Sequence, residues 1–580
     1  MVLPPPLAPL VSPCVLTSKM DKTMKKIFAY AVSAVTVLVV AASCSNKAFD
    51  DKYLDPSKTT ATTCDKMMTG TFIAGNQNTF NTYWRMYTWD NYFGKLAQTI
   101  GFSNNSGEMY YINDGYIKDR WNNFYDILRN FRILQNVYSE SQFPEYDKLF
   151  VDCAEIFVID HLSQLVDIWG PVPYNEAGYL GITGDLSSSY PSYDSDETLY
   201  KKMIERLDDI YTDLEGLKTS LPGGYLSTLQ AQDFINGGDI DKWLRYCNTL
   251  MLRLAVHVSA QGSLASSAKT YVAKAAGRLL VSDLDNTIEV KSDRDGFKYN
   301  ENFRDGFKDI NNTANQEMID AMQITGVDDP RLPVIYVPTQ KAYTPAAGAD
   351  PDDKAYAAGE YFGRSTLETT NEQNVRSGGN HNTEETRYYA RLNGKTFTYN
   401  NLMVSPIISA AEAWFLLAEA YKQGYASGNA EAAFKKGVEM SIKAYYKSNI
   451  NSDFSNPSIA STQANDFQAE EYPSDATISN YAQAVWDTYT DKLECIMTQK
   501  WLHFGIMQAT QAWTDIRRTG FPALYYPQDR AGSDNMTIVQ RVPYPTEEVN
   551  NNPDKNKEGA AMLSDGDNPY SVLFWAKKLQ

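Results

Sequence analysis

Two stretches of the chain combine aromatic rings with amide, carboxylate or guanidinium groups, the mixture that sugar binding requires. A sugar ring has apolar faces rimmed by hydroxyl groups, so a glycan site needs exposed aromatic side chains flanked by hydrogen-bonding groups. We predict ligand contacts from Trp89, Tyr92, Asn104 and Asn105 in residues 83–116, and from Tyr356, Tyr361, Phe362 and Arg364 in residues 356–389. Residues 83–116 also contain the rings of Trp84 and Tyr87. The alternative is that half or more of the rings in the two stretches belong to the core, those of Trp84 and Tyr87 in particular.

Patterns for catalysis or metal binding are missing from the sequence. The chain has four histidines, none of them in an HExxH motif, and no GxSxG nucleophile elbow, P-loop, GxGxxG fingerprint or DxDxDG calcium loop. A glycoside hydrolase needs two carboxylates at a fixed separation, and 71 acidic residues give no means of choosing the pair. We therefore predict no catalytic residue, no metal site and no cofactor, and keep hydrolysis as an alternative.

The overall charge argues against one class of partner. The formal net charge of the chain is −18 at pH 7. A protein with such an excess of acidic residues is repelled by phosphate backbones and by anionic membrane surfaces. Nucleic acid is therefore not an expected partner, and any attachment to a membrane needs a device other than a basic surface.

Residues 24–44 have the organisation of a secretory signal. Two lysines precede an apolar run over residues 27–42, and small residues lead into Cys44. The run is shorter than the roughly 20 apolar residues of a membrane-spanning helix. A cysteine at the cleavage point resembles the lipobox of bacterial lipoproteins, in which that cysteine is acylated, although Ala41 stands where leucine is commonest. The alternative is an ordinary secretion signal with a chance cysteine.

These features divide the chain into three expected parts. Residues 1–43 are a leader and lipoprotein signal peptide. We place its true start at Met24, with Met20 as the alternative, because a signal normally begins close to its lysines. Residues 44–56 are a polar tether between a lipid anchor at Cys44 and the folded body. Residues 57–580 contain no low-complexity linker and no apolar stretch long enough to span a bilayer, so we expect a single domain.

Helical periodicity dominates the folded body. Apolar residues recur at three- and four-residue steps, which predicts helices over residues 121–140, 146–170, 196–217, 239–260 and 264–281, and on both sides of a turn at Gly424–Gly428. The last pair resembles a tetratricopeptide unit, in which Gly437 would let two helices approach closely. Residues 286–312 and 326–400 are long and irregular. We predict a mainly α, tetratricopeptide-like scaffold of helical hairpins, with long loop excursions that carry recognition.

Several motifs resemble those of one family and occur in that family's order. They are VDIWGPVPYNEAG at 166–178, WLRYCNTLMLRLAVHVS at 243–259, DPRLP at 329–333, YFGR at 361–364, AEAWFLLAEAY at 411–421 and QKWLHFGIMQATQAWTDIRRTGFPAL at 499–524. On these motifs and the lipobox, the chain resembles the SusD/RagB-like outer-membrane lipoproteins, in the SusD-like branch often described as starch-binding. The irregular middle departs from the pattern, and ligand choice is expected there.

The resemblance implies a function. It implies a surface-exposed lipoprotein of Bacteroidetes-type bacteria, anchored to the outer membrane through lipid at Cys44. Such a protein captures a nutrient, most often a glycan, and acts as the lid of a SusC-like TonB-dependent transporter without breaking a bond. Two alternatives remain open beside hydrolysis: a lid for peptide cargo, and a tetratricopeptide-like adaptor that binds only protein.

The motif residues themselves are expected to be structural. A buried turn or a core position is predicted for Trp169, Pro171, Pro173, Tyr174, Trp501 and Trp513. Asn248, Arg253, Arg517 and Arg518 lie in apolar helices, and a buried guanidinium needs carboxylate or carbonyl partners, so these residues would tie helices together. Buried free thiols, not disulfides, are expected for Cys153, Cys247 and Cys495, which lie far apart in helix-like segments.

Overall fold

The computed structural model describes most of the chain beyond its N-terminal region. The described residues are 62–80, 82–101, 112–291, 306, 313–345, 347–348, 355–365, 368, 388–397, 400, 402–452, 470–526 and 538–577. The chain divides between Thr62 and Thr63, and the fold below is that of the unit Thr63–Gln580. The expected signal peptide, the lipidation site Cys44 and the tether over residues 44–56 lie outside the described residues.

Helices make up most of the described structure. The longer ones are α3 (Cys64–Ala74), α6 (Asp114–Ser139), α7 (Pro144–Trp169), α9 (Asp196–Ser220), α10 (Gly223–Gln232), α11 (Ile240–Val258), α12 (Ala265–Ala276), α17 (Ala410–Lys422), α18 (Ala430–Ile450), α19 (Asp475–Thr488), α20 (Lys492–Phe504) and α21 (Ala509–Thr519). The shorter ones are α4 (Asn76–Thr79), η1 (Arg85–Asp90), α5 (Asn91–Leu96), α8 (Leu180–Thr183), η2 (Leu186–Ser189), η3 (Leu284–Asn286), α14 (Gln316–Gln323), α15 (Leu332–Ile335), α22 (Thr546–Asn551) and α23 (Pro553–Ala560). None of these helices is both long and apolar enough to cross a bilayer.

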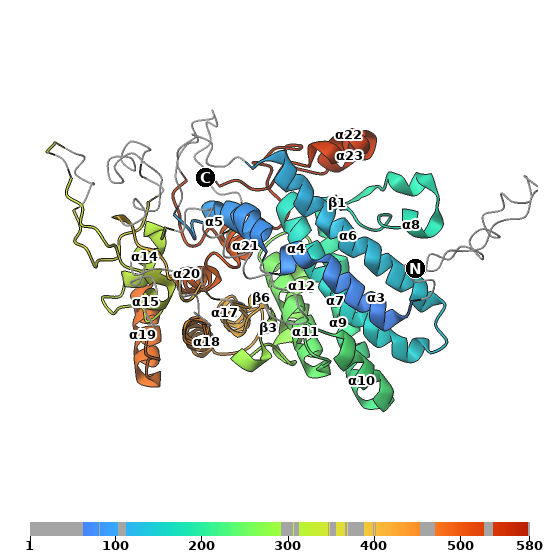
Figure 1. The fold of residues 1–580 in the computed structure, drawn as a ribbon, viewed down its shortest axis with the longest axis horizontal. Coiled ribbons are helices and arrows are strands. Elements are labelled where there is room, and N and C mark those ends of the chain that lie inside the picture. The colour runs from blue at the N-terminus through green and yellow to red at the C-terminus, as the bar shows by residue number, and fades with distance from the viewer. Residues whose placement is uncertain are drawn as a thin grey trace, which may run out of the picture. The chain divides into compact units, whose positions relative to one another are not determined.

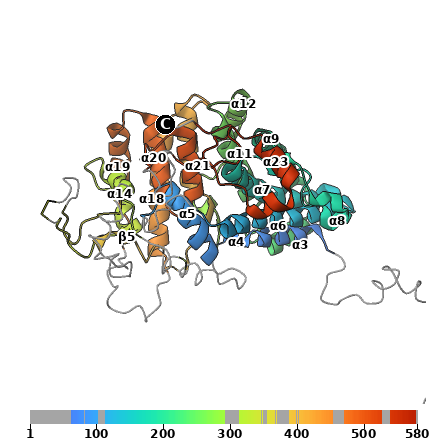
Figure 2. The ribbon, with the colours of Figure 1, turned by 90° about the horizontal axis from the view of Figure 1, so that it is seen from above.

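The longer helices pack as neighbours in pairs, which confirms the predicted mainly α, tetratricopeptide-like fold. Helices that follow each other in sequence lie against each other in α6–α7, α11–α12, α17–α18 and α20–α21, and α11 also packs on α9. The ribbon shows α3, α6 and α7 running side by side (Figure 1), and α18, α20 and α21 do so in the turned view (Figure 2). The predicted helix pairs around the turns near residues 141–143 and 424–428 are thus present.

Helix boundaries follow from local hydrogen bonding at each end. The side chains of Ser195, Asp239 and Ser409 accept hydrogen bonds from backbone N–H groups in the first turns of α9, α11 and α17. These caps satisfy amide groups that have no partner inside the helix. Helix α21 ends at Gly520, whose φ of +80° is a conformation that glycine adopts without strain. The helices therefore begin and end where the sequence supplies these residues.

Strands are short and tie the irregular segments to the helical scaffold. They form three antiparallel pairs: β1 (Val172–Pro173) with β2 (Tyr193–Asp194), β3 (Ile288–Val290) with β6 (Ser405–Ile408), and β4 (Tyr336–Val337) with β5 (Arg391–Leu392). In the second pair Ile288 faces Ile408, and in the third Tyr336 faces Leu392. The β4–β5 pair thus closes a loop within the irregular stretch 326–400, and the β3–β6 pair ties residues 288–290 to the segment just before α17.

Buried ion pairs join the helices, as the sequence predicts. The Arg253 guanidinium on α11 donates to both carboxylate oxygens of Glu412 on α17, at 2.6 and 2.9 Å. Arg518 on α21 pairs in the same bidentate way with Glu419 on α17. Arg517 donates to the backbone carbonyls of Asp167 and Gln540, and Asn248 to those of Ala275 and Leu279. Because each buried charge has partners, these residues fix the positions of helices without leaving an unpaired charge in the core.

The other structural predictions for the motif residues are also confirmed. Trp169, Trp501 and Trp513 are buried, and Pro171, Pro173 and the half-buried Tyr174 form the turn after α7. The indole N–H groups of the three tryptophans donate to backbone carbonyls. Cys64, Cys153, Cys247 and Cys495 are buried free thiols. The family-like motifs thus belong to the scaffold.

Gly437 allows the closest helix approach in the α17–α18 hairpin. A Cβ atom built on Gly437 would lie 2.8 Å from two ring carbons of Phe415, which is fully buried. Gly216 on α9 is also helical, but a Cβ there would meet no atom within 4 Å. The two glycines therefore differ in their surroundings and not in their helical backbone.

We expect opposite effects when these glycines are replaced by alanine. Gly216→Ala should raise the free energy of unfolding by up to about 1 kcal/mol, because alanine is the better helix former. Gly437→Ala should lower it by about 1–3 kcal/mol, because the added methyl group overpacks against the Phe415 ring. Urea denaturation followed by circular dichroism measures both values. A Gly437→Ala variant as stable as Gly216→Ala would contradict the described packing.

Acid should weaken the buried ion-pair cluster of Asp515, Lys500 and Arg518. Burial alone would raise the pKa of Asp515. The Lys500 ammonium and the Arg518 guanidinium, however, each lie 2.8 Å from one of its carboxylate oxygens. Their charges hold the pKa of Asp515 well below its ordinary value of 3.8. The stabilisation is then fully present above that value and is lost as the pH falls below it. The stability difference between the wild type and Asp515→Asn should shrink from about pH 7 to about pH 3. A difference that does not change with pH would refute this, and the exposed Asp126→Asn serves as control.

Candidate functional site

Four aromatic side chains gather near the start of η1 and of α6. We call Tyr83, Trp84, Tyr87 and Tyr116 the aromatic surface. The Trp84 side chain is 51% exposed, and the other three are half-buried. Tyr83 and Tyr87 stack with ring centroids 5.2 Å apart, and Trp84 and Tyr87 each lie 6.2 Å from Tyr116. The rings thus support one another while the indole of Trp84 stays open to solvent.

The aromatic surface depends on an unusual helix. Element η1 is a π-helix, whose hydrogen bonds join residues five apart, and such segments are frequent at functional sites. Tyr87 lies on the outward side of η1, and Trp84 is the residue immediately before the helix begins. Arg85, Trp89 and Asp90 are buried on the other side. The exposed Trp84 and the half-buried Tyr87 thus lie just before and within η1, while the same short helix buries the Arg85–Asp90 ion pair.

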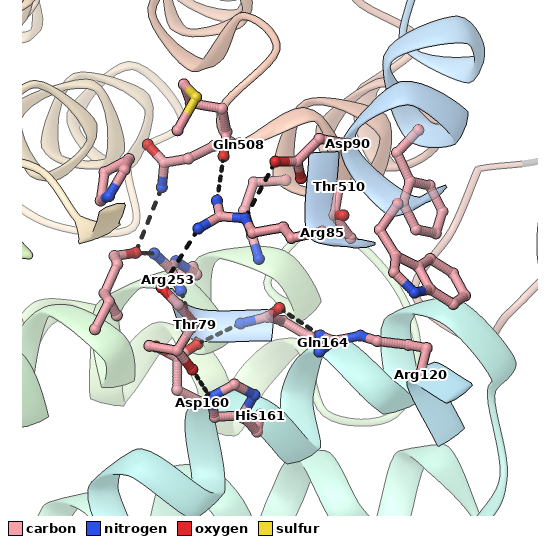
Figure 3. Close-up of a pocket in the computed structure, with 16 residues that line it drawn as sticks. Thr79, Arg85, Asp90, Arg120, Asp160, His161, Gln164, Arg253, Gln508 and Thr510 are labelled. Carbon is pink, nitrogen blue, oxygen red and sulfur yellow. Dashed lines mark hydrogen bonds and ion pairs between the residues drawn. The ribbon is translucent and has the colours of Figure 1, made fainter. Parts of the chain in front are cut away.

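The Arg85 guanidinium anchors this helix to distant parts of the chain (Figure 3). It donates to the backbone carbonyl of Met507 at 2.7 Å and to the hydroxyl of Ser405, and it lies 3.1 Å from a carboxylate oxygen of Asp90. The Ser405 hydroxyl in turn donates to the carbonyl of Thr79. Burial raises the pKa of Asp90 to about 6, and the charges of Arg85 and Arg120 oppose that rise. Near neutral pH Asp90 therefore remains the counterion of Arg85.

The structure corrects the expectation for Trp89 and Tyr92. Each is only 6% exposed, so the prediction that these rings are exposed is wrong. Trp89 stacks on Phe93 with centroids 5.5 Å apart, and Tyr92 meets the same ring edge-on at 5.2 Å. The physical reason is that these rings pack on Phe93 and, for Trp89, on Trp169. Arg85 and Asp90 can share this buried side because they pair with each other. Conversely Trp84, which the alternative interpretation placed in the core, is exposed.

The second predicted stretch is also mostly internal. Tyr356 and Arg364 are buried, contrary to expectation. The rings of Tyr356 and Phe362 stack at 4.2 Å, and the Arg364 guanidinium lies over the Tyr389 ring at 4.7 Å. These contacts give the loop its own small core, in which Phe362 is half-buried. Asn104 and Asn105 lie outside the described residues.

Tyr361 is the predicted residue of this stretch that reaches a cavity. The half-buried ring lines an open cavity of about 650 Å³ together with Asp328, Glu360 and Tyr446. Burial raises the pKa of Tyr361 to about 12, with further contributions from the negative charges of Glu470 and Asp328. The cavity has the size of a small-ligand site and carries both ring faces and carboxylates. Among the described residues, no cluster of three His, Cys, Asp or Glu side chains could hold a metal ion.

Sequence reasoning missed Tyr83 and Tyr116 as members of the aromatic surface. Both lie in the stretch of residues 83–116 that was selected for its composition, but thirty-odd residues of mixed polarity do not reveal which rings face outward. A usable signal is the spacing of Trp84 and Tyr87, which places them on one side of a helix. The spacing alone does not show that this side of the helix faces solvent, because that conclusion requires knowing that Arg85 on the other side is buried.

Solved structures with the same fold are known. A protein described as chitin-binding has a TM-score of 0.67 and 20% identity, over 88% of this chain and 100% of its own. A SusD homolog from Bacteroides fragilis NCTC 9343 has a TM-score of 0.65 and 18% identity, over 89% and 100%. A chitin-binding SusD homolog from Flavobacterium johnsoniae has a TM-score of 0.61 and 19% identity, over 88% and 99%. At these identities the likeness concerns the fold.

The sequence itself identifies the family. Residues 46–576 match the family described as SusD-like, the Susd and RagB outer membrane lipoproteins. Comparison with curated protein sequences gave no match. The match covers nearly the whole folded unit and confirms the resemblance drawn from the six motifs. The chain therefore belongs to the SusD/RagB family of outer membrane lipoproteins.

Proposed function

We propose that this protein captures a glycan at the cell surface and acts as the lid of a SusC-like TonB-dependent transporter. The observation that carries the proposal is the aromatic surface, where the exposed Trp84 stands among three tyrosine rings. Family membership and the two chitin-binding neighbours support a carbohydrate as cargo. The protein binds its cargo and breaks no bond in it.

The chemistry of the aromatic surface fits a sugar. The open indole of Trp84 offers an apolar plate for the C–H face of a pyranose, and the hydroxyl groups of Tyr83, Tyr87 and Tyr116 can donate to and accept from the ring hydroxyls. The edge-to-face contact between the Tyr87 and Tyr116 rings, with centroids 6.2 Å apart, holds the two rings against each other. Rings held by one another lose little freedom when a ligand binds, which favours affinity.

Further contacts belong to the same proposal. Tyr361 would bind a sugar unit within its cavity, with the carboxylate of Glu360 as acceptor for hydroxyl groups. Asn104 and Asn105 remain candidates because they precede Tyr116 closely in sequence. Phe362 would act through its stacking on Tyr356, which supports the backbone that carries Tyr361.

The membrane attachment would come from lipid. We propose that the signal peptide within residues 1–43 is removed and that Cys44 is acylated, with residues 44–56 as tether and residues 57–580 as one domain. One acyl chain binds a membrane only marginally, so stable anchoring needs more than one. Cys44→Ser should then reduce the recovery of this protein from the membrane fraction. Separately, purification of the transporter from outer membranes should recover this protein together with it. Equal recovery of the wild type and of Cys44→Ser from the membrane fraction would contradict the lipid anchor.

A glycan array with the purified full chain tests the proposed cargo. We expect saturable binding to one class of oligosaccharide, followed by recovery of the ligand unshortened. Shortened products would instead identify a hydrolase. A blank array together with binding to peptides, or to the transporter alone, would overturn the proposal in favour of a peptide lid or a protein-binding adaptor.

Replacing the exposed indole should affect binding alone. In Trp84→Ala we expect glycan affinity to fall by about tenfold or more, because the ring contact contributes about 1.5–3 kcal/mol when covered. The melting temperature should stay unchanged because the side chain is half exposed. Calorimetric titration measures the affinity. Tyr190→Ala, at an exposed ring outside the aromatic surface, is the matched control, and equal affinity losses in both variants would contradict the assignment.

Replacing the buried indole next to it should affect stability instead. Trp89→Ala removes a ring packed against Phe93 and Trp169 and leaves a cavity. We expect a loss of about 3–5 kcal/mol in the free energy of unfolding, measured by urea denaturation. If Trp89→Ala kept its stability and lost glycan binding, the division between the outward and inward sides of η1 would be wrong.

A further inference from the structure

A mostly apolar cavity of about 210 Å³ lies where the start of α17 and the ends of α18 and α20 come together. Four buried side chains form much of its wall, namely the rings of Phe397 and Phe504 and the thioether chains of Met403 and Met507. Leu402 also lines it and is 43% exposed, so the cavity is open to solvent on that side. An apolar cavity of about 150 Å³ is large enough to bind benzene, so this one has room for a small organic molecule.

The wall offers water few hydrogen-bonding partners. Its buried polar side chains are each hydrogen-bonded to another part of the protein, and they are Thr396, Asn400, Ser409, His503 and Gln508. The two ring nitrogens of His503, for example, lie 2.6 and 3.1 Å from the hydroxyl groups of Ser409 and Ser441. An ordered water molecule needs two to four polar partners. An apolar molecule therefore suits most of this cavity better than water does.

Glu289 on β3 is the exception in this wall. Its half-buried carboxylate lines the cavity and makes no ion pair or hydrogen bond with the described part of the chain. Burial raises the pKa of Glu289, and the positive charges of Lys447, Lys291 and Lys242 oppose that rise. Lys447 also lines the cavity. The carboxylate is thus a free acceptor among positive charges, where an uncharged donor is favoured over a further cation.

We propose that this cavity binds an uncharged aromatic molecule of one or two rings with one hydrogen-bond donor, such as indole or a phenol. Its ring would pack against Phe397 and Phe504, and the sulfur atoms of Met403 and Met507 also contact aromatic rings favourably. Its N–H or O–H group would donate to the Glu289 carboxylate. A sugar would bury several hydroxyl groups against this wall without partners, which is unfavourable.

The bound molecule would lie against the segments that anchor η1. Met507 lines the cavity, and its backbone carbonyl accepts a hydrogen bond from Arg85. Pro406, another residue of the wall, follows Ser405, whose hydroxyl also accepts from Arg85. The inference does not rest on the proposed function, because the wall contains no residue of the aromatic surface and none that lines the cavity of Tyr361.

Indole and an iodinated indole test the proposal directly. Crystals of the full chain soaked in 5-iodoindole should give an anomalous difference peak for iodine in the cavity next to Phe504. Calorimetric titration in solution should show saturable binding of one indole per chain. Indene, which has the same shape but no N–H group, should bind about tenfold more weakly, because it cannot donate to a carboxylate.

Three results of these measurements would overturn the proposal. The first is a soaked crystal without an iodine peak in the cavity. The second is a peak without saturable binding in solution, which would mark an adventitious additive only. The third is equal affinity for indole and indene, which would show that no donor is recognised.

A variant pair on α18 separates this cavity from nonspecific binding elsewhere. The half-buried Ala444 lines the cavity, and Ala444→Leu should fill part of it and abolish indole binding. Ala432→Leu, at an exposed position of the same helix, should keep the wild-type affinity. Indole binding that persists in Ala444→Leu would refute the assignment. If Ala444→Leu does not fold, Glu289→Leu decides instead, because its affinity for indole should fall to that for indene, and an unchanged affinity would refute the proposal.

Discussion

The buried guanidinium of Arg85 is the interaction on which the candidate site depends. It reaches two segments that lie more than 300 residues away from it in sequence, since Ser405 and Met507 both accept from it while Asp90 neutralises it. A buried charge with all its partners in place has few alternative positions, because moving it would leave several groups unpaired at once. The position of η1, and with it the exposure of Trp84, follows from this constraint.

The same principle extends through the scaffold beneath. Arg253 joins α11 to α17, Arg518 joins α21 to α17, and Asp160 on α7 receives hydrogen bonds from Tyr246 and Gln164. These contacts form a polar layer inside a helical body that is otherwise apolar. Because helices held in this way cannot slide past one another, the surface above them keeps its shape before any ligand arrives. A preformed surface binds with a smaller entropy loss than a flexible one.

Much of the scaffold could be predicted from sequence, and the orientation of the site could not. The helices over residues 114–139, 144–169 and 410–450 follow from apolar periodicity, because their buried sides are apolar. In η1 the buried side carries Arg85 and Asp90, which a sequence pattern assigns to solvent. That is why the sequence favoured exposure of Trp89 and left Trp84 as the ring that could equally belong to the core. For the loop residues Tyr356 and Arg364, burial depends on stacking partners such as Tyr389, and no local pattern indicates which distant ring will be the partner.

This division between scaffold and surface explains how the fold can persist while ligand choice varies. The neighbouring structures share only 16–22% identity with this chain and still match its fold with TM-scores between 0.58 and 0.67. Burying apolar side chains and pairing a few charges is enough to maintain the helical body, and neither requires a particular residue on the outer side of η1. A ring such as Trp84 is half exposed, so its replacement is expected to cost little stability. If the aromatic surface binds the cargo, as we propose, substitutions there could change the ligand while the scaffold stays intact.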